Sequence, residues 1–160
     1  MEETNAKDMD SQRISKLFSD LYDGNAWIDV TIVGTLKNVN SRQAYTKAAE
    51  NLNSIWEIVN HLVSWRETVL KRMNGENIDE PKNNFFEPIK DNSEEAWQNT
   101  LKRFDESQKM WLQFLSGFEN QNLEKYYLQS KYTYYDLMHG ILQHDAYHLG
   151  QIVLLKKMVG

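Results

Sequence analysis

The chain has 160 residues, a formal net charge of −5 and no cysteine. This length indicates one domain spanning residues 1–160. The lack of thiols excludes disulfides, thiolate metal ligands and a cysteine nucleophile. An acidic surface repels phosphate backbones, and no cluster of Lys and Arg offsets this, so nucleic acid is not an expected partner.

The N-terminal segment is acidic and polar, and residues 1–9 are expected to be frayed. It lacks the basic start and apolar core of a signal peptide. The longest apolar stretches fall well short of the roughly 20 residues that a membrane helix needs. We therefore expect a cytoplasmic protein with no membrane partner.

The first regular element is a helix over residues 11–22, because its apolar residues recur at helical spacing. Gly24 is suited to end it. Residues 27–33 are rich in β-branched side chains, but a lone strand would have no partner, so an ordered loop or short helix is expected over 26–40. Residues 41–50 are polar and are expected to form a helical turn. The apolar positions of the first helix are Ile14, Leu17, Phe18 and Leu21.

The second long helix is predicted over residues 52–73, starting at Leu52, with a broad apolar face. A long connection then follows over residues 75–92 and contains both prolines, Pro81 and Pro88.

The third helix is predicted to begin after Ser93 as N-cap, since two glutamates follow where they complement the helix dipole. Its apolar residues alternate at spacings of four and three, which is typical of a bundle seam. The fourth helix is predicted from some point after Lys131 to the C-terminus. Four helices with one apolar face each indicate an all-α fold, a four-helix bundle with long connections, and a crossover topology is compatible with those lengths.

Three of the four histidines form a pattern that indicates a metal site. His144 and His148 are separated by four residues on the fourth helix, so they lie about 40° apart around its axis and about 6 Å apart along it. Two such imidazoles can bind one ion from the same helix. Imidazole suits zinc, nickel, copper, iron or cobalt, whereas magnesium and calcium prefer oxygen ligands.

His61 borders the apolar face of the second long helix and is the candidate third ligand. A buried imidazole needs a partner, and a metal shared with the pair would supply one. The spacing alone leaves open that His61 is a core residue satisfied by a neighbour. His139 lies about 140° and 180° around the helix from the pair, so it is expected at the surface or in a second layer, away from the ion.

Two segments resemble the signatures of the DinB-like (DinB/YfiT-like) metalloenzyme family. Residues 140–152, Gly-Ile-Leu-Gln-His-Asp-Ala-Tyr-His-Leu-Gly-Gln-Ile, resemble its C-terminal signature, and residues 54–65, Ser-Ile-Trp-Glu-Ile-Val-Asn-His-Leu-Val-Ser-Trp, resemble its helix-two signature. Gly-Asn-Ala-Trp at 24–27 also fits. The resemblance implies a four-helix bundle whose metal ligands are His61, His144 and His148.

The resemblance further implies one divalent transition metal, zinc or nickel, and a homodimer. Most members of the family that the chain resembles are regarded as metal-dependent hydrolases, and some relatives transfer a low-molecular-weight thiol such as bacillithiol, mycothiol or glutathione. We expect an enzyme that transfers such a thiol to an electrophile, because a divalent ion held by three imidazoles can deprotonate a bound thiol. A metal-dependent hydrolase that uses metal-bound hydroxide is one alternative. A non-enzymatic helical dimer that binds metal or a partner is the other.

Four residues near the histidines are weaker candidates for a role. Glu57 lies one turn before His61 and could support a ligand or act as a base, although a solvated helix charge is the alternative. Asp145 points about 100° from His144 and is expected on the outer face. Tyr147 and Gln151 belong to the matched signature without an assigned role. His144-Asp145-Ala146-Tyr147-His148 also lacks the Glu of a zinc protease motif, which sets that activity aside.

Overall fold

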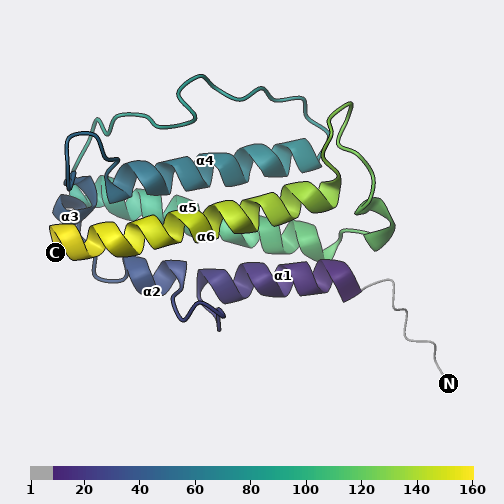
Figure 1. Ribbon diagram of the computed structural model, residues 1–160, viewed down its shortest axis with the longest axis horizontal. Coiled ribbons are helices and arrows are strands. Elements are labelled where there is room, and N and C mark those ends of the chain that lie inside the picture. The colour runs from purple at the N-terminus through teal and green to yellow at the C-terminus, as the bar shows by residue number, and fades with distance from the viewer. Residues whose placement is uncertain (1–8) are drawn as a thin grey trace.

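The structure, a computed structural model, describes residues 9–160, and the prediction of an all-α fold is confirmed for them (Figure 1). The expected fraying of residues 1–9 lies outside the described residues except at Met9, which begins the first helix. Within the described part, an isolated bridge between Tyr126 and Thr133 is the extent of β-structure. The helices are α1 (Met9–Tyr22), α2 (Ile32–Leu36), α3 (Ser41–Tyr45), α4 (Ile55–Met73), α5 (Glu94–Ser116), the 3-10 turn η2 (Asn120–Asn122) and α6 (Tyr134–Val159).

The four long helices pack as a bundle. α4 lies against α5 and α6, and α1 lies against the other side of the same two helices. The short helix α3 packs on α4 and α5 near the end of the bundle at which α6 terminates, and α2 lies beside α6, beyond the end of α1 (Figure 1). The connection between α4 and α5 runs back along α4, so these two helices point the same way while α1 and α6 point the other (Figure 1). The crossover topology that long connections allow is the one the chain adopts.

The start of α4 differs from the prediction. Leu52 was expected inside the helix, but it precedes the helix and is 38% exposed. Ser54 is the N-cap: its hydroxyl accepts a hydrogen bond from the amide of Glu57, whose carboxylate accepts one from the amide of Ser54. This capping box satisfies two amides that the first turn leaves unpaired, which sets the boundary three residues later than apolar periodicity suggests.

The predictions for α5 and α6 are confirmed. Ser93 is the N-cap of α5, and α6 starts at Tyr134 behind a capping box of Thr133 and Asp136. The predicted seam of α5 supplies much of the core, in which the apolar side chains of Trp97, Phe104, Trp111 and Leu115 are buried.

Residues 26–50 also match the expectation, because they form an ordered connection with the short helices α2 and α3. One detail of α1 does not: Leu17 was placed on its buried stripe but is 52% exposed. Ile14, Phe18 and Leu21 of that stripe are buried as expected. Within residues 9–160, every helix is too short or too polar to cross a membrane.

Candidate metal centre

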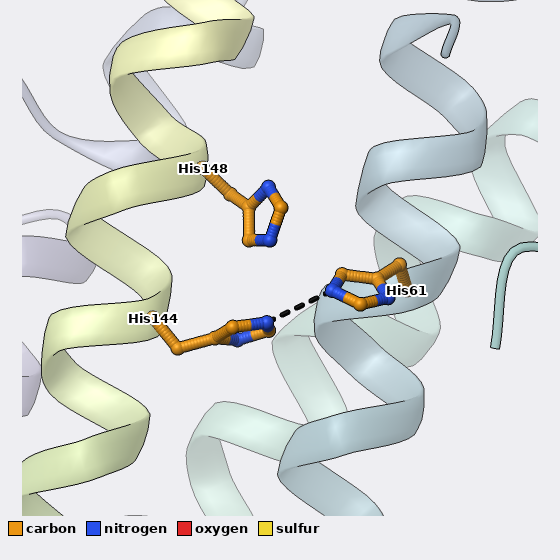
Figure 2. Close-up of side chains that lie close together, drawn as sticks. All are labelled: His61, His144 and His148. Atoms are coloured by element: carbon orange, nitrogen blue, oxygen red, sulfur yellow. Dashed lines mark hydrogen bonds between the residues drawn. The ribbon is translucent and has the colours of Figure 1, made fainter. Parts of the chain in front are cut away.

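The bundle brings three histidines from two helices to one point. His61 projects from the middle of α4, and His144 and His148 project from α6, which packs directly on α4. One ring nitrogen from each residue lies within 4.8 Å of those of the other two. Figure 2 shows the three imidazoles turned into the space between the helices. His61 is the most deeply placed, with 1% of its surface exposed.

A hydrogen bond to the backbone of Asn84 sets the tautomer of His61. Nδ1 of His61 lies 2.6 Å from the backbone carbonyl oxygen of Asn84, and because a carbonyl only accepts, Nδ1 must donate. In the neutral ring Nε2 then carries a lone pair. This Nε2 lies 2.8 Å from Nε2 of His144 (Figure 2).

His148 is oriented in the same manner. Its Nδ1 lies 2.6 Å from the amide oxygen of Gln151, while the amide nitrogen of Gln151 donates to the hydroxyl of Tyr147 at 3.2 Å. With the amide turned this way, Nδ1 of His148 is the donor and Nε2 is left as an acceptor. Figure 2 shows this ring nitrogen directed toward the other two histidines.

This arrangement fits a cation. Two rings have their Nδ1 atoms held as donors by oxygen acceptors, so their Nε2 lone pairs face inward. The Nδ1 atom of His144 is buried and has no hydrogen-bond partner within the described chain. Converging lone pairs repel unless a proton or a metal ion lies between them, and imidazoles held by oxygen acceptors are the usual form of histidine ligands.

Burial also keeps the rings in the ligating form. Desolvation lowers the pKa of His61 to about 4, with the carbonyl of Asn84 opposing that shift. Desolvation, reinforced by the nearby charges of His148, His61 and Arg66, lowers the pKa of His144 to about 3. Desolvation lowers the pKa of His148 as well, and the hydrogen bond that this ring donates to Gln151 opposes the shift. All three rings are therefore neutral near pH 7 and can donate lone pairs.

The connection between α4 and α5 covers the His61 side of the centre. The ring of Phe86 stacks on that of His61 at 4.0 Å between centroids and 9° between planes. The side-chain oxygen of Asn84 accepts a 2.8 Å hydrogen bond from the indole of Trp65, one turn after His61. Asn84 and Phe85 have φ angles of 51° and 60°, a left-handed conformation that is unfavourable for phenylalanine. The chain thus accepts local strain where it reaches the site.

The structure separates the other candidates from the centre. His139 is exposed and stacks on Tyr135, as expected for a histidine that faces away from the pair. Both carboxylate oxygens of Glu57 are engaged elsewhere, one in the cap with Ser54 and the other with Lys47 at 3.2 Å. These contacts account for Glu57 without a chemical role.

The prediction for Asp145 is wrong. It was expected on the outer face, but its side chain is fully buried and pairs with the equally buried Arg66. The physical reason is that Asp145 continues the apolar row of Ile141 and Ile152, which points into the core. Burial raises the pKa of Asp145, and the guanidinium of Arg66 opposes this.

Sequence analysis missed Asn84, Phe86 and the role of Gln151. Gln151 follows His148 by three residues, a spacing that places both on one helix face, so its hydrogen bond was detectable. Asn84 and Phe86 lie in a connection without periodicity, and nothing local to the sequence marks them.

The fold and the site define an all-helical bundle with a buried three-histidine cluster that can hold one metal ion. A family model of the DinB superfamily matches residues 31–152, which include all three histidines. The chain belongs to the DinB superfamily. No curated protein and no solved structure matches it.

Proposed function

We propose that this protein binds one divalent transition metal, zinc or nickel, through His61, His144 and His148, and that it transfers a low-molecular-weight thiol to an electrophile. The observation that carries the proposal is the convergence of three neutral imidazoles from two helices. Three protein ligands are typical of catalytic zinc sites, in which a small molecule takes the remaining position.

The chemistry follows from the donor set. A divalent ion held by three neutral ligands keeps its full charge and stabilises the thiolate form of a small thiol. The chain has no cysteine, so the reacting sulfur must come from the substrate. In the transfer, a carbon–sulfur bond forms at the electrophilic carbon, the leaving group departs with its bonding electrons, and the thiol proton passes to solvent.

The protein residues bind and orient in this scheme. Asn84 and Gln151 hold two rings in the tautomer that leaves Nε2 available. Phe86 places apolar surface beside His61 and Trp65 places it beside His144, which favours an electrophile with an apolar body and limits access of water.

The test uses untagged protein. We expect elemental analysis to find about one metal ion per chain, and a strong loss in His148→Ala. His139→Ala is the matched control, because this histidine is on the same helix but faces away. Zinc- or nickel-loaded protein is then assayed with glutathione, bacillithiol or mycothiol and 1-chloro-2,4-dinitrobenzene, with chloride and thioether measured together.

Thiol-dependent release of chloride that is lost in His148→Ala would support transfer. Failure of every thiol with several electrophiles would contradict it. Turnover of an ester without thiol would assign hydrolysis to the same centre instead. Metal binding without turnover in either assay would favour the non-enzymatic alternative.

The proposal includes a homodimer in the cytoplasm. A surface groove of about 780 Å³ between α1 and α6 is lined by apolar side chains such as Leu21 and Leu142 and by polar ones such as Asp20 and Gln143. Trp27 stands at this groove and is 97% exposed. The groove and the indole of Trp27 lie on the same face of the molecule. In a dimer with a two-fold axis through this face, Trp27 of each copy would pack against the other copy. Light scattering should give a dimer for the parent and a monomer for Trp27→Asp.

A further inference from the structure

A single arginine in the core is bonded to a neighbour of the metal ligands. Arg66 and Asp145 both have fully buried side chains. Nε of Arg66 donates a 2.8 Å hydrogen bond to Oδ2 of Asp145, and Nη2 lies 2.8 Å from the same oxygen. This is an ion pair between α4 and α6, the two helices that carry the histidines.

The contacts of Arg66 extend to the other two long helices. Its Nη1 donates to the side-chain oxygen of Gln108 in α5 at 2.9 Å, and Gln108 donates onward to the backbone carbonyl of Phe18 in α1 at 3.2 Å. The guanidinium lies 5.2 Å from the ring centroid of Phe104 and 5.7 Å from that of Phe18. The network therefore ties α4 directly to α5 and α6 and, through Gln108, to α1.

The ion pair lies next to the histidines in sequence on both helices. Arg66 follows His61 by five residues, about 7.5 Å along an ideal helix. Asp145 directly follows His144 and precedes His148 by three residues. A one-residue shift of α6 along α4 would break the ion pair and would also move both ligands of α6 by about 1.5 Å along the axis and 100° around it.

Stability alone does not explain why the core contains a buried ion pair. Removing two charges from water is expensive, and well-packed apolar residues of similar volume often stabilise a core as well or better. The best-attested use of such a buried polar contact is to select one register among alternatives. Apolar contacts are non-directional, whereas a hydrogen-bonded ion pair is lost after a small displacement, and a metal site requires such atomic alignment.

We infer that Arg66 and Asp145 form a positioning pair that sets the register of α6 on α4 so that His61, His144 and His148 meet at one ion. The inference rests on the metal binding proposed above. The two residues do not touch the ion; they act through the helices that carry its ligands.

The test replaces the pair by apolar residues of similar size, in Arg66→Met/Asp145→Leu. We expect this double variant to fold and to melt within a few degrees of the parent, because no charge is left unpaired. We also expect its dissociation constant for Co²⁺ to rise by about 10- to 100-fold, the usual effect of losing outer support of metal ligands. The visible absorption spectrum of bound Co²⁺ should change as the ligand geometry relaxes.

The matched control is Arg103→Met/Glu67→Leu. This exposed ion pair joins α5 to α4, with Nε of Arg103 2.8 Å from the Glu67 carboxylate, and it does not involve α6. Its removal should leave Co²⁺ affinity and spectrum at parent values. An equal loss of affinity in this control would overturn the inference, because any ion pair would then have the same effect.

Parent-like Co²⁺ affinity and spectrum in Arg66→Met/Asp145→Leu would also overturn it. If that variant does not fold, Arg66→Lys is the second test, since it keeps the charge but loses the paired donors of the guanidinium. Folded Arg66→Lys with the Co²⁺ affinity of the parent would overturn the inference. Weaker Co²⁺ binding in this variant would support it. Failure of the parent itself to bind Co²⁺ would instead contradict the metal site.

Discussion

Nδ1 of His61 donates a 2.6 Å hydrogen bond to the backbone carbonyl of Asn84, a residue 23 positions later in the connection between α4 and α5. The contact fixes the tautomer of a buried ring, and a main-chain atom provides it. The side chain of Asn84 is in turn held by the indole of Trp65. The geometry of the candidate centre thus depends on the conformation of a segment without regular structure.

Substitutions at Asn84 should separate its conformation from its side chain. Asn84→Val should weaken zinc binding by about 10- to 100-fold, because a β-branched residue strongly disfavours the φ of 51° that directs the carbonyl at His61. Asn84→Gly keeps this conformation and should cost less. Competition with a chelator measures both. Trp65→Phe removes the same side-chain hydrogen bond as Asn84→Gly, so the two variants should have the same zinc affinity. Zinc affinity at the parent level in Asn84→Val would refute the role of the carbonyl.

Gln151 should act through His148. Gln151→Leu removes the oxygen that accepts from Nδ1, so we expect about tenfold weaker metal binding. Gln151→Glu keeps an acceptor at that place and should bind at least as tightly as the parent. The pair is measured by the same chelator competition. Equal affinities in the Leu and Glu variants would show that the hydrogen bond does not orient the ring.

The metal-free protein should lose stability in acid. The folded pKa values of about 4 for His61 and about 3 for His144 lie below the ordinary 6.5, so the unfolded chain takes up protons first. Their contribution to stability is complete above about pH 6.5 and is lost as the pH falls through 4 toward 3. Melting curves in chelator at stepped pH measure this.

The decline should be shallower in His144→Asn than in the parent, whereas His139→Asn should follow the parent curve. This comparison removes the contribution of carboxylates, which titrate in the same range in all three proteins. Parallel curves for the parent and His144→Asn would show that the buried ring does not resist protonation.

Glu57 should matter for stability and not for chemistry. Glu57→Ala removes a capping-box contact and should lower the free energy of unfolding by about 1 kcal/mol, as should Ser54→Ala. Metal content and any thiol-dependent turnover should stay at parent levels in both. Denaturant melts and elemental analysis check this. A turnover loss in Glu57→Ala that Ser54→Ala does not share would restore Glu57 as a chemical group.

Most of the long elements and two of the three clustered histidines were predictable, because they depend on local patterns. The four-residue spacing of His144 and His148 holds them on one helix face whatever packs against it. Ser93 is an N-cap by its own chemistry. The short helices α2 and α3 follow polar caps, Thr31 and Asn40, for the same reason.

The wrong placement of Asp145 and the omission of Asn84 both depend on partners far along the chain. Asp145 was placed outside because it points about 100° around the helix from His144, and its buried partner Arg66 lies 79 positions earlier. Its periodicity with Ile141 already indicated the core, so the offset from His144 was given too much weight. Asn84 could not be placed, since its position depends on how the α4–α5 connection returns along the bundle.

The stacking of Phe86 on His61 has a consequence for how fast the ion would exchange. An aromatic ring lying flat on one ligand blocks departure along that side until the connection moves. The lifetime of a loaded site would then depend on movement of this connection, while its equilibrium affinity would depend on the three histidines and on the residues that orient them. Two proteins with the same three histidines could therefore bind zinc equally tightly and still release it at very different rates, according to how the α4–α5 connection packs on the site.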